Sequence, residues 1–354
     1  MNTCESSGSS NVRGVGLIEI MVGIVISMLL VLMIFQVYLV TEGQKRTITS
    51  SNDAQENASY GLFLLGQELA GAGNVVAAST AALSGCAMLR PIPVIIAAGA
   101  TDNDPDTLTV FFGGSGALST PTAYLNSAVV STSPPGVYQV LGPVGFSPND
   151  FIAAVEGTNC TLSTINAGGV AVAPATGIAT IGHTLTATPG NNSTATYNAV
   201  TASLINLGQG DRFGRTLYSV DLTNSALMTQ SLLPAVLPAT PVVSNVVNLK
   251  AQFGLDTNND GTVDTWQPAT GNWSSVNLPL QPVATWQQIR ALRVAIVTRS
   301  NKYETDTVTP GPLGLLCSPA PCAVSMTLTA DQQHYRYKVL ETIVPLRNAM
   351  WNAP

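Results

Sequence analysis

Charged residues are scarce in this chain of 354 residues, because Asp, Glu, Lys and Arg make up only 10% of it. The net charge is −6, and no run or stripe of Lys and Arg is present, so the sequence predicts no nucleic-acid partner. Neither of the two histidines stands at zinc-ligand spacing with a cysteine. The sequence also lacks G-x-S-x-G, H-E-x-x-H and a glycine-rich phosphate loop, so we expect the protein not to be an enzyme.

Cysteine is sparse as well, and the five cysteines are Cys4, Cys86, Cys160, Cys317 and Cys322. Cys4 lies in a segment that we expect to be removed, which leaves an even number for disulfide bonds. The short spacing of Cys317 and Cys322 predicts a local bridge, so that Cys86 pairs with Cys160. A metal site or free thiols are the alternatives. Two disulfides would place this part of the chain outside the cytosol.

The longest apolar run covers residues 15–40. It is long enough to cross a bilayer as a helix, for which about 20 residues suffice. Its one charge is Glu19, near the start, and a carboxylate in hydrocarbon is costly unless it is neutralised. A signal peptide carries its small-residue cleavage site after the apolar run, whereas here the small residue, Gly14, comes before it. Arg13 predicts that the N-terminal side stays in the cytoplasm and that the rest of the chain lies outside.

The start of this run resembles the class III leader of type IV prepilins, in which a short polar leader ends in Gly and a Glu follows within the apolar helix. The residues that match are Gly14, Val15, Leu17, Ile18, Glu19, Ile20, Met21 and Val22. Val15 replaces the usual aromatic residue, and Gly16 stands where Thr or Ser is commoner. The resemblance implies that a prepilin peptidase cuts between Gly14 and Val15 and that the new amine is methylated. In a filament this amine of one subunit would pair with Glu19 of the next, which makes Glu19 the assembly residue.

Residues 41–73 continue the helical pattern but become amphipathic. The apolar stripe consists of Ala54, Ala58, Leu62, Leu65, Leu69 and Ala72. The segment Gly71–Asn74 is a helix stop. We therefore expect the outer half of the helix to lie on a globular domain and the inner half to form a hydrophobic stalk.

Residues 74–354 read as an extracytoplasmic, β-rich globular domain in which short apolar runs alternate with Gly, Pro, Asn and Ser. The clearest strand candidates are 107–112, 137–141, 217–222, 243–253, 289–297 and 335–344. The low-complexity region 166–198 predicts exposed loops or edge strands, with His183 as a surface residue. The expected fold class is α+β, type IV pilin-like, with one long N-terminal helix packed on an antiparallel sheet and long loops.

Four local sequences together resemble the PilW family of minor pilins. They are Gln55-Glu56-Asn57 ahead of Leu65, Glu68 and Ala72-Gly73; Phe253-Gly254-Leu255-Asp256; Trp286 with Ile289, Arg290, Leu292 and Arg293; and Glu341-Thr342-Ile343-Val344-Pro345-Leu346-Arg347-Asn348. The resemblance implies a minor pilin at or near the pilus tip. Its partners would be other major and minor pilins, the prepilin peptidase, an inner-membrane assembly platform, a tip adhesin and, before assembly, membrane lipid. A pseudopilin of a type II secretion system and a membrane-anchored extracellular binding module or enzyme are the alternatives.

One acidic segment has the spacing of half a calcium loop. Its candidate ligands are Asp256, Asn258, Asp260, Thr262 and Asp264, with Gly261 at the sharp turn. Gln267 stands where a full loop has its bidentate Glu, and β-type sequence replaces the flanking helices. A plain hairpin turn needs the same residue types for backbone reasons. Calcium is therefore the one candidate cofactor, and a bare turn is the favoured interpretation.

Overall fold

The computed structural model describes residues 16–73, 80–113, 122–123, 129–130, 136–141, 144–173, 176–186, 188, 190–191, 195–198, 201–210 and 213–350. The chain divides into two compact units, residues 1–50 and residues 51–354. The predicted leader 1–14 and the predicted cut between Gly14 and Val15 lie outside the described residues.

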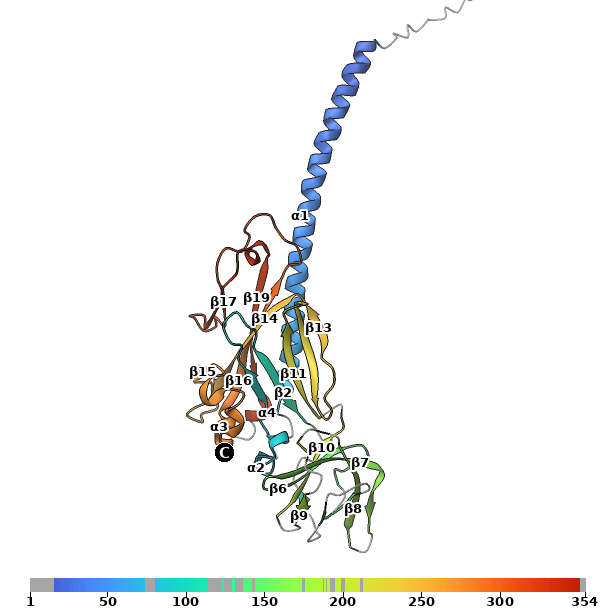
Figure 1. The fold of residues 1–354 in the computed structure, drawn as a ribbon, viewed down its shortest axis with the longest axis vertical. Coiled ribbons are helices and arrows are strands. Elements are labelled where there is room, and N and C mark those ends of the chain that lie inside the picture. Colours follow the sequence, from blue (N-terminus) through green and yellow to red (C-terminus); the bar gives the residue numbers. More distant parts are fainter. Residues whose placement is uncertain are drawn as a thin grey trace, which may run out of the picture. The chain divides into compact units, whose positions relative to one another are not determined.

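The long helix α1 runs without interruption from Leu17 to Gly71 (Figure 1). Residues up to 50 belong to the first unit, and the helix continues from Ser51 in the second. Its end is made by glycine, because Gly73 adopts a φ of +76°, which is the left-handed conformation that glycine favours after a helix. The helix therefore ends in the segment that the sequence predicts to stop it.

Two antiparallel sheets of the second unit share a core with the outer part of α1. The five-stranded sheet has the order β1-β2-β11-β12-β13, and the four-stranded sheet has the order β15-β14-β16-β19. The strands of the first are β1 (Val94–Ala97), β2 (Thr107–Phe112), β11 (Gly214–Asp221), β12 (Ala226–Leu233) and β13 (Thr240–Ser244). Those of the second are β14 (Val246–Leu255), β15 (Thr265–Gln267), β16 (Ile289–Arg299) and β19 (Tyr337–Pro345). The α+β class with antiparallel sheets is thereby confirmed.

The strand β16 is buried along nearly its whole length because both faces of the four-stranded sheet are covered. The core shared with α1 lies on one face and includes Leu292, Val294 and Ile296. A small hairpin of β17 (Leu313–Leu315) and β18 (Val324–Met326) packs on Ala295 and Val297 on the other face. This explains why the sequence of β16 is almost continuously apolar instead of alternating.

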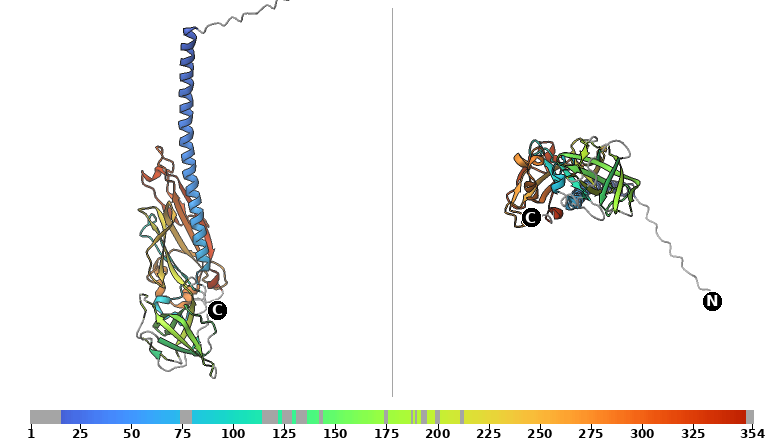
Figure 2. Two further views of the ribbon diagram at one scale, coloured as in Figure 1. Left: turned by 90° about the vertical axis from the view of Figure 1, so that its right-hand side faces the viewer. Right: turned by 90° about the horizontal axis from the view of Figure 1, so that it is seen from below.

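A third, six-stranded sheet has the order β3-β10-β6-β7-β8-β5. Its strands are β3 (Thr122–Ala123), β5 (Gly136–Leu141), β6 (Phe151–Glu156), β7 (Asn159–Val172), β8 (Ile178–Leu185) and β10 (Ser203–Gly208). All of them lie in the sequence between β2 and β11, and Phe112 at the end of β2 is paired directly with Gly214 at the start of β11. The segment 113–213 is thus an insertion that leaves the five-stranded sheet and returns to the same place (Figures 1 and 2).

The remaining elements are short. They are the pair β4 (Val129–Val130) and β9 (Thr196–Tyr197), the helices α2 (Thr80–Leu83), α3 (Val283–Gln287) and α4 (Arg347–Met350), and the 3₁₀ turns Ala87–Leu89, Gly271–Trp273, Leu278–Leu280 and Gln332–His334. The helix α4 lies at the end of α1, where Asn348 Nδ2 donates to Ala72 O at 3.1 Å (Figure 2).

The predicted strands match the structure with two corrections. The run 243–253 is not one strand, because Asn245 has a φ of +65° and separates β13 from β14. The low-complexity region 166–198 is not confined to exposed loops or edge strands, since β8 pairs with β7 on one side and β5 on the other and buries Ile181 and His183. Long-range pairing, which a local pattern does not reveal, places β8 inside the sheet.

Candidate functional site

The first candidate site is the apolar part of α1, residues 17–40, which belongs to the first unit. Its large apolar side chains are all exposed, with exposed fractions between 50% and 77%. At about 1.5 Å per residue this part is roughly 36 Å long, which is sufficient to cross a bilayer core of about 30 Å. The helix thus has the length and composition of a membrane-spanning segment.

Glu19 is the acidic residue in the first turn of α1, and its backbone N–H donates to Gly16 O at 2.9 Å. A carboxylate in the first turn interacts favourably with the positive end of the helix dipole. The next charged residue, Glu42, lies beyond the apolar part and pairs with Arg46, with 3.2 Å between Oε1 and Nε. Glu19 is therefore the one charge in the described apolar part of the helix, and the pairing partner predicted for it, the amine of Val15, lies outside the described residues.

The outer part of α1 packs along the predicted stripe. Ala54, Ala58, Leu65, Leu69 and Ala72 are buried, whereas Leu62 is half-buried. The sequence reasoning missed a sixth buried position, Gly61, where a Cβ atom would lie 2.7 Å from Cδ1 of Ile296 in β16. The glycine allows α1 to approach the sheet closely at this point. Glycine does not contribute to a hydrophobic periodicity, so the apolar pattern did not mark this position. The one available signal was the place of Gly61 between Ala58 and Leu65 on the same stripe.

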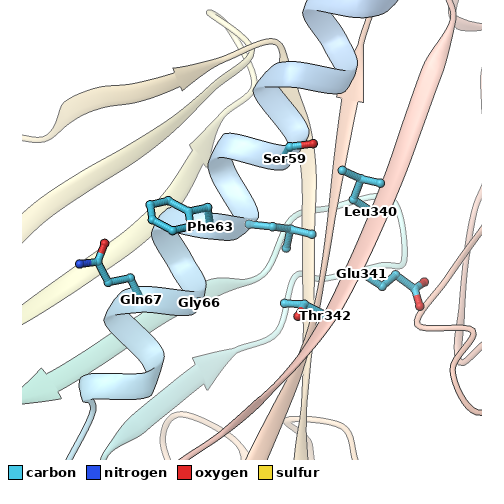
Figure 3. A pocket seen from close by; sticks show the side chains of 8 residues that line it. Ser59, Phe63, Gly66, Gln67, Leu340, Glu341 and Thr342 are labelled. Carbon is cyan, nitrogen blue, oxygen red and sulfur yellow. The ribbon is translucent and has the colours of Figure 1, made fainter.

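A groove of about 540 Å³ lies between the outer part of α1 and the strand β19 (Figure 3). It is lined by Ser59, Leu62, Phe63, Gly66, Gln67, Leu340, Glu341 and Thr342. Leu340 and Thr342 lie on the side of β19 that faces α1, whereas Glu341 points to the other side (Figure 3). Glu341 there accepts the N–H of Cys317, with 3.0 Å between N and Oε2.

The Asp256–Asp264 segment forms the turn of a hairpin between β14 and β15. Asp256 is buried and accepts the N–H groups of Asp260 at 3.1 Å and Gly261 at 3.0 Å, and Arg290 Nε donates to Asp256 Oδ2 at 3.1 Å. Burial works against ionisation, but the Gly261 N–H and the Arg290 guanidinium outweigh it and lower the pKa of Asp256 below its ordinary value.

The other carboxylates of this turn also have partners within the chain. Asp264 Oδ2 accepts from the N–H and the hydroxyl of Thr257, at 2.7 and 2.9 Å, and Asp260 Oδ1 accepts from the N–H and the hydroxyl of Thr262, at 2.8 and 2.6 Å. In the part of the chain that the structure describes, no group of three or more His, Cys, Asp or Glu is placed to hold a metal ion. These contacts are those of a hairpin turn, which is the interpretation that the sequence favours over a calcium loop.

Both disulfides have the pairing that the spacing predicts. Cys86 and Cys160 are joined with 5.4 Å between their Cα atoms, which links the segment before β1 to β7 in the insertion. Cys317 and Cys322 close a tight loop. Arg293 Nη1 on β16 donates to Ser318 O in this loop at 3.2 Å, so the loop is held on the four-stranded sheet.

His183 is not the surface residue that its low-complexity surroundings predict, because its side chain is only 2% exposed. Its ring stacks on Tyr138 at a centroid distance of 4.0 Å and an angle of 7°. Neither ring nitrogen has a hydrogen-bond partner among the described residues. Burial lowers the pKa of His183 to about 4.

One comparison with known proteins matches the C-terminal region. The family model of PilW, the type IV pilus-assembly protein W, matches residues 214–348. This range begins at β11 and contains the whole four-stranded sheet, the Asp256 turn and β19. A search of curated proteins gave no match. Among solved structures, a type IV-like pilin, TTHA1219 from Thermus thermophilus, is similar at 12% identity and a TM-score of 0.33, over 83% of this chain and 96% of that chain.

Proposed function

Because the PilW family model matches residues 214–348, we propose that the chain is a minor pilin, which assembles through its N-terminal helix into a type IV pilus. One observation carries the proposal: an exposed apolar helix with a single carboxylate, Glu19, in its first turn precedes the PilW-like region. Cleavage after Gly14 would create an amine at Val15, and this amine would pair with Glu19 of a neighbouring subunit in a medium of low dielectric. The role of the protein is then structural and not catalytic.

We further propose a place at or near the pilus tip, where the chain helps to start assembly. The bulk of the domain formed by residues 74–354 supports this, because so large a domain would pack poorly along a dense shaft. Before assembly the chain would lie in the bacterial inner membrane with its N-terminus in the cytoplasm, next to the prepilin peptidase and the assembly platform. After assembly its neighbours would be other major and minor pilins and a tip adhesin.

N-terminal mass spectrometry of the chain from membranes and from sheared filaments tests the proposal. The expected start is a methylated Val15, and Glu19→Ala should remove the chain from filaments but leave it in membranes. Glu42→Ala is the matched control, because this carboxylate lies on the same helix beyond the apolar part. A chain that still begins at Met1, or a Glu19→Ala variant that assembles normally, would show that α1 serves only as a membrane anchor. Assembly that requires a type II secretion system would make the chain a pseudopilin, and uniform immunogold labelling of the shaft would exclude the tip.

A further inference from the structure

The buried imidazole of His183, on the inner strand β8, is in close contact with the strand β5. Its ring stacks on Tyr138 of β5 at a centroid distance of 4.0 Å. Gly136 of β5 lies directly opposite His183 in the pairing of the two strands, and a Cβ atom at Gly136 would come within 2.6 Å of the imidazole Nε2. The ring therefore occupies space that only a glycine at position 136 leaves free.

The surroundings of His183 offer no negative charge to a protonated imidazole. Asp150 and Glu156 are the acidic residues in the described part of the insertion, and each accepts a backbone N–H elsewhere, at 2.9 and 3.0 Å. The neighbouring strand β7 contributes no titratable side chain, because its cysteine is in a disulfide. Tyr138 and Tyr197 in the same core stay neutral, since burial raises the pKa of both. A proton on the buried imidazole would therefore create an uncompensated charge, which is costly.

The strand β5 is the element beside His183 that can separate at the lowest cost. It is the last strand of the six-stranded sheet, and among the described strands of that sheet it pairs with β8 alone, from Gly136↔His183 to Leu141↔Ile178. Separation of β5 breaks one ladder of backbone hydrogen bonds, whereas separation of β8 would break two. It would also remove Tyr138 and Gly136 from the imidazole and so admit water to the ring.

We propose that β5 is an acid-sensitive edge strand: when His183 takes up a proton, β5 separates from β8 while the other strands of the sheet stay paired. The positive charge is then solvated by water, which removes the cost of a buried cation. The open edge of the sheet moves from β5 to β8, and Tyr138 and Val140, both fully buried at neutral pH, become accessible. The insertion thereby gains a surface that depends on pH, and this inference is independent of the proposed function.

Hydrogen–deuterium exchange of the full chain in detergent, with each rate divided by the intrinsic exchange rate at the same pH, tests the proposal. Between pH 7 and pH 4.5 the equilibrium constant for the opening of β5 should rise about 50-fold, because the pKa of His183 is about 4 in the closed state and 6.5 when the ring meets water. The strands β6 and β10, which pair with each other in the same sheet, should keep their protection. An equal loss of protection in β5, β6 and β10, or no loss in β5, would overturn the proposal.

Variants identify the group that takes up the proton. In His183→Phe and in His183→Gln the side chain cannot be protonated in this range, so the exchange of β5 should no longer depend on pH. Tyr138→Phe keeps the stacked ring without its hydroxyl, and His334→Phe removes the other histidine, which lies outside the insertion; both should retain the 50-fold effect. Acid-dependent opening of β5 in a variant without His183 overturns the proposal. The comparison of β5 with β6 in the unaltered chain needs no variant, so it decides even if both His183 substitutions prevent folding.

Discussion

Arg290 and Asp256 form a buried ion pair, with 3.1 Å between Nε and Oδ2 and side-chain exposures of 2% and 0%. Asp256 follows β14 directly, and Arg290 lies near the start of β16. Their backbones are also tied to the sheet, since Asp256 N–H donates to Gln288 O and Leu346 N–H donates to Arg290 O. The pair thus connects the hairpin turn, the start of β16 and the end of β19 within the PilW-like region.

Loss of one member of this pair should destabilise the protein strongly. Arg290→Met removes the guanidinium and leaves the Asp256 carboxylate buried without its charged partner, which is costly. Arg336→Met is the control, because Arg336 pairs with Glu304 at 3.4 Å while its side chain is 44% exposed. Such an exposed pair contributes at most about 1 kcal/mol. In denaturant titrations of the full chain in detergent, Arg290→Met should lower the free energy of unfolding several times more than Arg336→Met, and equal losses would contradict this.

The same ion pair predicts that the Asp256 turn does not bind calcium. The Asp256 carboxylate already accepts two backbone N–H groups and the Arg290 guanidinium, whose positive charge would repel a cation. Calorimetric titration of calcium into the full chain should therefore give no saturable heat. Saturable binding that Asp260→Asn abolishes would restore the calcium interpretation of this loop.

Gly61 and Gly66 lie on the same helix and offer a matched comparison. Gly61→Val would force a Cβ to within 2.7 Å of Ile296 Cδ1, whereas Gly66→Val meets nothing within 4 Å. The overpacked site should lose about 1–3 kcal/mol of unfolding free energy. The open site should gain a few tenths of a kcal/mol, because Val has a higher helix propensity than Gly. Since the substitution is identical, helix propensity cancels in the difference. Denaturant titration of both variants checks this, and equal effects would refute the close approach of α1 to β16.

The long helix α1 and several strands of this chain follow from local patterns. The apolar run and the stripe from Ala54 to Ala72 predicted α1 to within two residues at each end. The run 107–112 predicted the bounds of β2 correctly. In these elements the composition and the spacing of the apolar residues agree with the burial that the structure shows.

The remaining features depend on contacts that are distant in sequence. The pairing of Phe112 with Gly214, which makes 113–213 an insertion, has no local signal on either side. The Ala/Thr/Gly-rich β8 became an inner strand because β5 and β7 flank it. In the candidate groove, Gly66 and Leu340 are far apart in the chain and come together only because β19 pairs with β16 beside α1. Local sequence therefore predicted the long helix α1 but not the groove.

The stability of the insertion should decrease in acid because of His183. The folded chain keeps this histidine neutral down to about pH 4, whereas the imidazole of an unfolded chain takes up its proton near pH 6.5. Between these values the unfolded state binds more protons than the folded state, so the free energy of unfolding falls as the pH is lowered. The contribution of the neutral His183 to the free energy of unfolding is fully present above about pH 6.5 and lost below about pH 4. It amounts to roughly 3 kcal/mol, since each unit of pKa shift corresponds to 1.36 kcal/mol.

His183→Phe keeps a ring to stack on Tyr138 but cannot be protonated. Its unfolding free energy, relative to that of the unaltered chain, should rise as the pH falls from about 6.5 to about 4 and should be constant above this range. Carboxylates titrate in both proteins and cancel in the difference. Urea titrations of the full chain in detergent at several pH values give the two curves, and His334→Phe, which removes the other histidine, should leave the His183 contribution in place. Parallel curves for His183→Phe and the unaltered chain would show that the buried imidazole is not the acid-sensitive group.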